Sequence, residues 1–152
     1  MERTESVIVN AGIERSFLVL SEMTNYALWL DFIDSVEPID SEGDPVWTLV
    51  LKAQLGPFSR MKKLRMAKVL SDHHRLIRFR REEVSGKDVS EWSIDVIFEQ
   101  LDLNDTQITF KVSYSGKLWS RALETAFNSY VEKARIDLQS YFVSLRAESE
   151  DE

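Results

Sequence analysis

Several residue types that often carry protein chemistry are absent or scarce in this sequence. It has no cysteine, only two histidines, three prolines and five glycines among 152 residues. Without cysteine the chain has no disulfide, no thiolate nucleophile and no cysteine-based zinc site. No apolar run approaches the ~20 residues that cross a bilayer, and the first residues lack the apolar centre of a signal peptide. We therefore expect a cytoplasmic protein without metal, cofactor or stable insertion into a membrane.

The charge is acidic overall but unevenly distributed. The formal net charge is −7 and the isoelectric point is near 5.0, which argues against nucleic acid as a partner. Nine of the 19 Lys and Arg residues nevertheless lie between Arg60 and Arg81, where Asp72 is the only acid. These cations either form surface ion pairs with acids on a neighbouring strand, which we favour, or attract an anionic headgroup or partner.

The composition predicts one folded domain over residues 1–152. Hydrophobic residues make up 43% of the chain, enough to build a packed core. The two ends, Met1 to Glu5 and Glu148 to Glu152, are polar and are expected to be disordered, solvated tails.

A long amphipathic helix is predicted from Lys117 to Arg146. Apolar residues recur every three or four positions, which places them on one face of an α-helix. Gly116 precedes the helix and allows a sharp entry from the preceding strand. The apolar face comprises Trp119, Leu123, Ala126, Phe127, Tyr130, Ala134, Leu138, Tyr141 and Leu145.

The residues before this helix predict a sheet. The β-branched run in Thr4–Asn10 indicates a first strand, and two short helices follow at Ala11–Met23, with Asn10 as N-cap, and at Asn25–Ile33. Alternating or β-rich segments then predict further strands at Val36–Ile39, Val46–Gln54, Lys62–Leu70, Arg75–Glu83, Ser90–Leu101 and Thr106–Ser115.

Simple hairpins predict how three of these strands pair. A turn around Gly86–Lys87 sets Phe79 opposite Ile94 and Ile77 opposite Val96 on the inner face, with Arg78 opposite Asp95 outside. A turn at Asp72–His73 sets Met66 opposite Phe79, so that Leu64 and Met66 also face inward. A slip of one residue would place Arg against Phe throughout.

Certain local segments resemble a known superfamily. They are Asn25-Tyr26 followed by Trp29, then Phe32-Ile33 and Val36-Glu37, and Tyr114-Ser115-Gly116-Lys117-Leu118-Trp119 at the strand-to-helix junction. With the order of elements, they resemble the START-like helix-grip superfamily (SRPBCC), which includes polyketide cyclase/dehydrase and lipid-transport proteins. The resemblance implies an α+β fold in which a curved antiparallel sheet of about six to seven strands surrounds a long C-terminal helix. It also implies an apolar cavity between them for a bulky apolar ligand.

Few residues suggest catalysis. His73 and His74 are adjacent in a turn with no third metal ligand at a suitable spacing, so we interpret them as exposed turn residues. Asp31, Asp34 and Glu37 form a loose acidic group, and a paired-carboxylate site is less favoured there than solvated charges.

Asp137 lies on the flank of the helix's apolar face and allows two interpretations. It either fixes the polar end of a ligand in the cavity or forms a rim ion pair with Lys133 one turn earlier, which we favour because a lone buried carboxylate is costly.

The favoured function is noncatalytic binding of a bulky apolar or amphipathic small molecule, lipid- or polyketide-like. Alternatives are an enzyme of the polyketide cyclase or aromatase kind, and a protein–protein adaptor without a ligand. The sequence leaves the oligomeric state open. Small helix residues facing aromatic strand residues suit a pocket, and the predicted ligand contacts are Trp47, Leu49, Leu64, Met66, Phe79, Trp92, Ile94, Phe110, Tyr114, Ala126, Tyr130 and Asp137.

Overall fold

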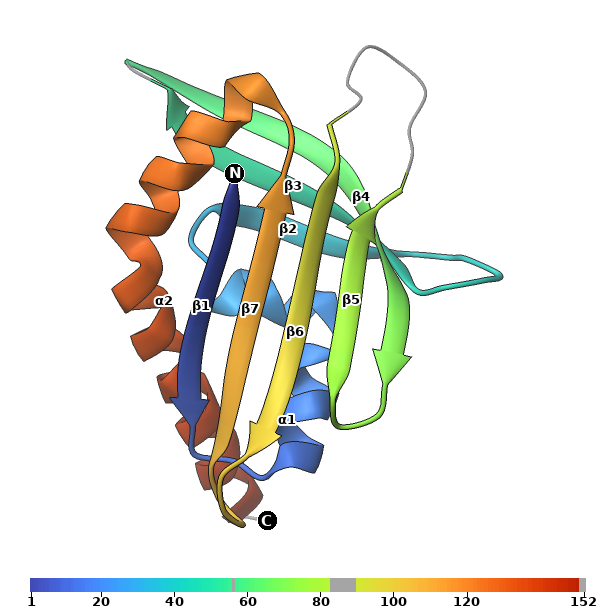
Figure 1. The fold of residues 1–152 in the computed structure, drawn as a ribbon, viewed down its shortest axis with the longest axis vertical. Helices are drawn as coiled ribbons and strands as arrows, with labels where there is room; N and C mark the ends of the chain where they lie inside the picture. Colours follow the sequence, from blue (N-terminus) through green and yellow to red (C-terminus); the bar gives the residue numbers. More distant parts are fainter. Residues whose placement is uncertain (56, 83–89, 151–152) are drawn as a thin grey trace.

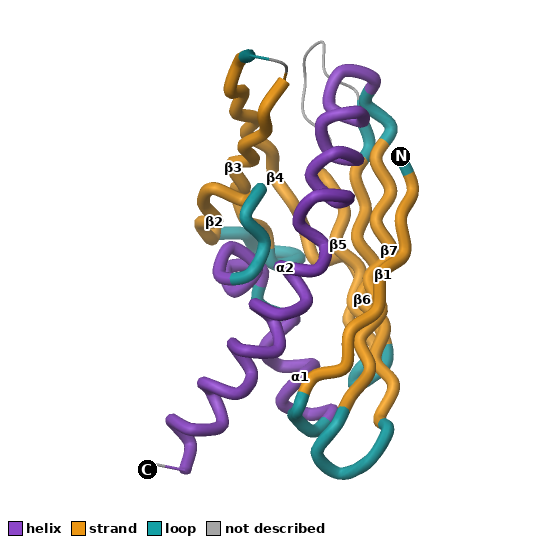
Figure 2. The backbone as a smooth tube through the Cα atoms, turned by 90° about the vertical axis from the view of Figure 1, so that its left-hand side faces the viewer, coloured by secondary structure: helices purple, strands orange, loops and turns teal. Residues whose placement is uncertain are grey.

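The computed structural model describes residues 1–55, 57–82 and 90–150 of the chain. One long helix lies across the concave side of a curved sheet, as Figures 1 and 2 show from two directions. The elements, in chain order, are β1 (Glu2–Val9), α1 (Ile13–Leu20), the 3₁₀ helix η1 (Met23–Leu28), β2 (Ile33–Ile39), β3 (Val46–Leu55), β4 (Phe58–Asp72), β5 (Leu76–Arg81), β6 (Trp92–Gln100), β7 (Thr106–Tyr114) and α2 (Lys117–Glu150).

The described strands form one antiparallel sheet in the order β1-β7-β6-β5-β4-β3-β2. The first strand, β1, therefore lies at one edge of the sheet and pairs with the last strand, β7. Apolar and polar residues alternate along β6 and β7, and the apolar set lies on the concave face. In Figure 2, α2 passes between β2–β4 on one side and β1 with β5–β7 on the other. The predicted α+β helix-grip fold is confirmed.

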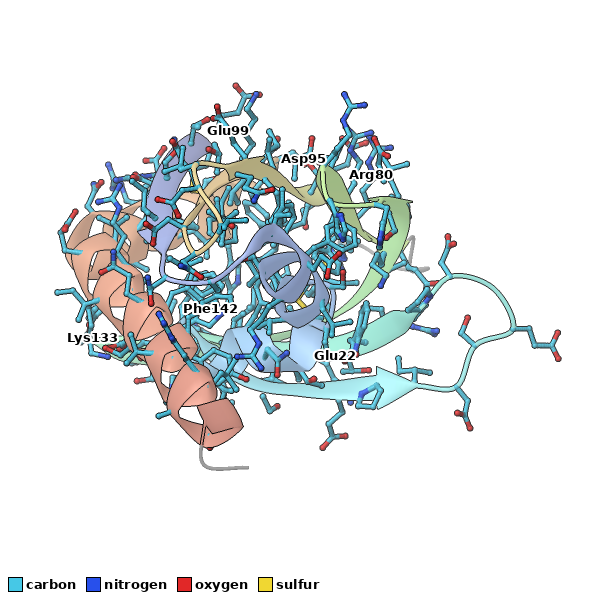
Figure 3. All side chains as sticks on the ribbon, turned by 90° about the horizontal axis from the view of Figure 1, so that it is seen from below. Glu22, Arg80, Asp95, Glu99, Lys133 and Phe142 are labelled. Atoms are coloured by element: carbon cyan, nitrogen blue, oxygen red, sulfur yellow. The ribbon has the colours of Figure 1, made fainter. Side chains whose placement is uncertain are left out.

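The register predicted between β5 and β6 is also confirmed. Phe79 pairs with Ile94 and Ile77 with Val96, while Arg78 lies opposite Asp95. Arg78 donates to both carboxylate oxygens of Asp95, at 2.8 and 3.1 Å. Figure 3 shows Asp95 on the side of the sheet away from α2. The predicted turn around Gly86–Lys87 lies outside the described residues.

The register predicted between β4 and β5 is wrong. Met66 lies opposite Arg81, and Phe79 lies opposite Lys68. A β-bulge shifts the pairing between Lys68 and Leu70. The turn is also longer than expected, since Asp72 pairs with Leu76 and the Arg75 N–H bonds to the Asp72 carbonyl within the turn. Met66 nevertheless faces inward, as expected, and is fully buried.

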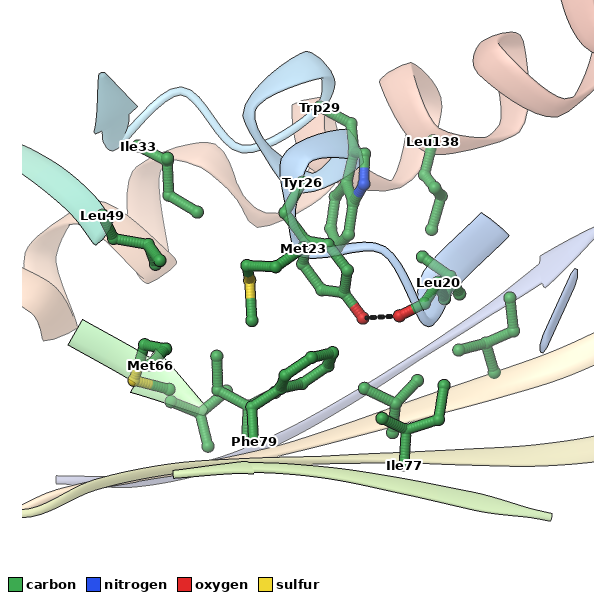
Figure 4. Close-up of a cluster of buried hydrophobic side chains, with 14 of the residues drawn as sticks. Leu20, Met23, Tyr26, Trp29, Ile33, Leu49, Met66, Ile77, Phe79 and Leu138 are labelled. Atoms are coloured by element: carbon green, nitrogen blue, oxygen red, sulfur yellow. Dashed lines mark hydrogen bonds between the residues drawn. The ribbon is translucent and has the colours of Figure 1, made fainter. Parts of the chain in front are cut away.

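The two short helices are shorter than the sequence predicts. The first, α1, begins at Ile13 with Gly12 as its N-cap rather than Asn10, and no side chain caps it. The second is a single 3₁₀ segment, η1, that starts two residues before the predicted Asn25. Tyr26 of η1 is buried, and its hydroxyl donates to the Leu20 carbonyl at 2.8 Å (Figure 4).

The long helix α2 spans 34 residues, or about 50 Å at 1.5 Å per residue. Trp119, Leu123 and Leu138 of the predicted apolar face are buried against the sheet and the short helices. Phe142, not assigned to that face, is fully buried, and Figure 3 shows it on the side of α2 that faces the rest of the molecule. No described helix is both long and apolar enough to cross a membrane.

The expected tails contain regular structure. Residues Glu2 to Glu5 belong to β1 and pair with residues Phe110 to Ser113 of β7. Glu148 lies within α2, while residues 151–152 are outside the described part of the chain. Arg3 and Glu5 alternate with Thr4 and Ser6, so β1 continues the pattern of Val7 and Val9 onto the inner face.

Candidate functional site

A cavity lies between the concave face of the sheet, η1 and α2. The space open to the centre of a water molecule is about 70 Å³, several times the ~10–15 Å³ that one water needs. Its walls come from β1, from η1 and the segment directly after η1, and from β6, β7 and α2. The lining residues are Arg3, Glu5, Ser6, Val7, Tyr26, Trp29, Leu30, Asp31, Phe32, Trp92, Ile94, Phe110, Val112, Ala126, Phe127, Tyr130, Val131, Ala134, Arg135 and Leu138.

The sheet and η1 supply an aromatic wall. Trp92 and Ile94 are alternate residues of β6, and Phe110 lies on β7, so all three point to the concave face. Tyr26 of η1 and Trp29, the residue directly after η1, cover them. The ring of Trp29 lies 5.2 Å from that of Tyr26 and 5.2 Å from that of Phe110, measured between centroids. These contacts are within the range of favourable aromatic pairs and hold the wall in place.

Helix α2 supplies the opposite wall with residues three or four positions apart. Ala126 and Ala134 carry only a methyl group, and they leave space where larger side chains would fill it. Phe127 packs against Phe32 at 5.3 Å between ring centroids. Tyr130 is half-exposed, at 49%, and therefore lies at the opening of the cavity.

Charged side chains form a rim where β1 meets α2. Arg135 donates to the Glu5 carboxylate at 2.6 Å and to the Ser6 carbonyl at 2.9 Å. Arg3 donates to the other oxygen of Glu5 at 2.7 Å and also bonds to Asn128. The guanidinium carbon of Arg3 lies 5.8 Å from the centroid of the Phe127 ring. The rim charges are thus paired with each other beside an apolar interior.

The structure brings five of the twelve predicted ligand contacts together. Trp92, Ile94, Phe110, Ala126 and Tyr130 all line the cavity. Because each comes from an inward strand position or from the apolar face of α2, alternation and helical spacing were sufficient to select them. Their role as ligand contacts stays a prediction.

The other seven predicted contacts lie elsewhere. Five are buried in the core on β3, β4 and β5, where other side chains cover them: Trp47, Leu49, Leu64, Met66 and Phe79 (Figure 4 labels three of these). Tyr114 is also buried, beside Trp92, and its hydroxyl accepts a hydrogen bond from Lys62 at 3.1 Å. Asp137 bonds to Lys133 and does not line the cavity.

The ion pair between Lys133 and Asp137 is confirmed, with a partner that the sequence did not indicate. Lys133 lies 2.5 Å from Asp137 and 3.1 Å from Asp31. Its hydrogen bonds to Asp137 and then to Asp31 raise the pKa of Lys133 above its ordinary value. Figure 3 shows Lys133 on the outer side of α2. Asp31 also lines the opening of the cavity, so this cation ties α2 to the segment after η1.

Of the remaining candidates for chemistry, Asp31 lines the cavity opening, whereas His73, His74 and Asp34 do not. His73 and His74 occupy the β4–β5 turn, as expected, but His74 is half-buried rather than exposed. Their rings stack at 3.8 Å and meet the edge of Phe17. Asp31 pairs with Lys133 whereas Asp34 pairs with Lys52 at 3.7 Å. Among residues 1–55, 57–82 and 90–150, no three His, Asp or Glu side chains group in a way that could hold a metal ion.

Two arginines of the basic stretch between Arg60 and Arg81 form surface ion pairs, as the favoured interpretation predicts. Arg78 pairs with Asp95, and the hydrogen bond to that carboxylate raises the pKa of Arg78 further above its ordinary value. Arg65 pairs at 3.0 Å with Glu82, the residue directly after β5, a partner that the predicted hairpins do not indicate. Lys62 faces inward instead, toward Tyr114.

Comparison with solved structures places this geometry among known folds. A conserved protein from Geobacillus kaustophilus has a TM-score of 0.70 and 11% identity over 95% of this chain and 96% of that one. A START superfamily protein from Mycobacterium smegmatis has a TM-score of 0.66 and 15% identity over 95% and 98% of the two chains. The fold is START-like.

A second named neighbour is an enzyme. The Zhui aromatase/cyclase from Streptomyces sp. R1128 has a TM-score of 0.59 and 18% identity, over 95% of this chain and 92% of that one. No protein-family profile matches the sequence, and no curated protein matches it. At these identities the likeness concerns the START-like fold alone.

Proposed function

We propose that the protein binds a bulky apolar or amphipathic small molecule in the cavity between the sheet and α2. The observation that carries this proposal is the cavity itself, an apolar space walled by residues of β1, η1, β6, β7 and α2. Protein interiors are otherwise close-packed, and an apolar cavity edged by a few polar groups is the usual form of a small-molecule site.

The arrangement of side chains suits a lipid-like or polyketide-like ligand with one polar end. Its apolar part would contact Trp29, Phe110 and the two alanines of α2. The polar end would lie at the rim, near Arg3 and Arg135, where it could share the charged hydrogen bonds that these residues make with Glu5. Such a ligand would lose little solvation at its polar end while burying its apolar surface.

A cyclase-type reaction has weaker support from these residues. Of the titratable groups that line the cavity, Arg3, Glu5, Asp31 and Arg135 are engaged in ion pairs. Tyr26 is fully buried, and burial raises the pKa of its hydroxyl well above the ordinary value of 10.0. A general acid or base works best when its pKa lies near the working pH, so Tyr26 is poorly matched to proton transfer.

One substitution on α2 tests the proposal. In Ala126→Trp the indole would occupy the cavity, so binding of an apolar fluorescent dye should weaken by about tenfold or more while stability changes by less than ~1 kcal/mol. Ile136→Trp is the matched control, because Ile136 is exposed on the same helix and dye binding should not change. Ala122→Trp measures the cost of overpacking, since Ala122 is buried outside the cavity lining.

Native mass spectrometry of protein purified from its own source complements the titration. A retained molecule with apolar character would support binding and reveal the ligand's mass. If the parent protein binds no dye and retains no ligand, and Ala126→Trp is destabilised as strongly as Ala122→Trp, the cavity does not bind small molecules. The adaptor alternative would then be preferred.

A further inference from the structure

Two tryptophans in the cavity wall have indole groups that find no partner in the described part of the chain. Trp29 and Trp92 are 5% and 3% exposed, and both line the cavity. Neither Nε1–H has a hydrogen-bond acceptor among the residues that the structure describes. In Figure 4 the nitrogen of Trp29 is on the edge of the ring toward Leu138, another cavity residue.

Other buried polar groups nearby do have partners. Trp47, outside the cavity lining, donates its indole N–H to the Glu22 carboxylate at 2.9 Å. The Tyr26 hydroxyl donates to the Leu20 carbonyl at 2.8 Å. Buried donors in folded proteins are nearly always paired with protein, water or ligand. Unpaired indoles at the cavity therefore mark a place where a further acceptor belongs.

The surroundings specify the kind of acceptor. An indole N–H only donates, so only a group with a lone pair satisfies it. A buried water needs two to four polar partners. Of the lining side chains, Ile94, Phe110 and Leu138 offer none, the Tyr26 hydroxyl already donates to the Leu20 carbonyl, and the charged groups lie at the rim. The cations of the rim are already paired with Glu5, so the interior lacks the opposite charge that a buried anion would need. A neutral oxygen fits these conditions.

We propose that Trp29 and Trp92 are ligand-binding donors that select molecules with a neutral carbonyl oxygen over hydrocarbons of the same shape. This inference rests on the proposed function, because it places the ligand in the same cavity. A carbonyl oxygen has two lone pairs, so one group can accept from one or both indoles. The aromatic wall would contribute affinity, and the two N–H groups would contribute selectivity.

A pair of isosteric probes tests the selectivity. 2-Acetylnaphthalene carries a carbonyl oxygen where 2-isopropenylnaphthalene carries a methylene group. The ketone should bind about tenfold more tightly, the factor expected for one hydrogen bond gained to a buried donor. In ¹⁵N-labelled protein the ketone should also move the indole N–H resonance of Trp29, Trp92 or both downfield, and the alkene should not.

Single substitutions assign the effect to residues. Trp29→Phe and Trp92→Phe each keep an aromatic ring but remove the donor, so at least one should reduce the preference for the ketone several-fold. Trp47→Phe is the control, because it removes an indole that is paired with Glu22 outside the cavity lining, and the preference should persist. The spectra of the parent protein remain decisive if a variant does not fold.

The outcomes separate this inference from the proposal on which it rests. Equal affinity for both probes, with unchanged indole resonances, would overturn the selectivity and leave the binding function standing. Failure of both probes to bind, together with no binding of an apolar dye, would overturn both.

Discussion

The hydroxyl oxygen of Tyr114 lies 2.3 Å from the position that a Cβ atom would take on Gly116. The ring cannot simply move aside. Tyr114 is 2% exposed, packs edge-on against Trp92 at 5.4 Å between ring centroids, and accepts a hydrogen bond from Lys62. The glycine before α2 is thus required by close approach of a side chain from the last strand.

Gly116→Ala should therefore lower the free energy of unfolding by about 1–3 kcal/mol, the usual cost of overpacking. Urea denaturation measures this directly. Gly43→Ala is a matched control, because no described atom beyond Gly43 and its two chain neighbours lies within 4 Å of the added methyl group, and its effect should stay within ~0.5 kcal/mol. Equal effects at the two glycines would contradict the packing argument.

Tyr26→Phe should destabilise the protein by about 1–2 kcal/mol. The change removes the buried hydrogen bond to the Leu20 carbonyl and leaves that acceptor without its donor. Tyr141→Phe, on a half-buried residue of α2, should change stability by less than ~0.5 kcal/mol. Thermal unfolding of the two variants gives the comparison, and a neutral Tyr26→Phe would mean that water replaces the lost donor.

The β4–β5 turn holds His74 in the left-handed region, with φ at 62°. A β-branched residue adopts this conformation poorly, so His74→Val should cost about 1–2 kcal/mol, whereas His74→Gly should be neutral or slightly stabilising. His73→Val at the neighbouring position is the control and should have the smaller effect. Chemical denaturation tests the order, and His73→Val as costly as His74→Val would contradict it.

The raised pKa of Lys133 predicts that the stability of the folded protein depends on pH in the alkaline range. Its pKa is raised in the folded protein, so the native state holds this proton more tightly than the unfolded chain does. The contribution of its ion pairs to stability is therefore complete below the unfolded pKa and is lost as the pH rises through the folded one. The stability difference between the parent and Lys133→Met should be present at pH 8 and vanish well above pH 10.5.

The same titration can be followed on the ammonium group itself. The pKa of Lys133 measured by NMR should exceed 10.5 in the parent and fall in Asp137→Asn and in Asp31→Asn. A value that neither substitution changes would show that the two contacts do not form in solution.

The sequence determines which face of a strand is buried more clearly than it determines register. Arg78-Phe79-Arg80 and Ile94-Asp95-Val96 alternate so strongly that a slip of one residue would place charges on the inner face, and the structure has a pairing that keeps them outside. The bulge between Lys68 and Leu70 adds one residue with no glycine or proline to mark it. The alternation predicts the correct face for Met66, but its predicted partner is wrong because the turn pairs Asp72 with Leu76 and the bulge then changes the offset by one residue.

The position of the cavity is harder to predict than its walls. Inward residues of β3, β4 and β5 carry the same alternation as those of β6 and β7, yet η1 and the core cover the former. The part of the concave face that is left uncovered depends on where the helices pack against the sheet. That packing joins residues far apart in the chain, so the local pattern of each strand does not indicate it. Arg3 and Glu5 were missed because short polar ends resemble tails, although their alternation with Val7 placed them on the inner face.

The pairing of β1 with β7 has a consequence for how the protein folds. Glu2 meets Ser113, so a strand made first waits for a partner more than a hundred residues later. Such distant pairing is slow, because a long loop must close before the contact forms. During synthesis β1 therefore remains unpaired until residues 106–114 leave the ribosome, and the wall carrying Arg3 and Glu5 is completed only then.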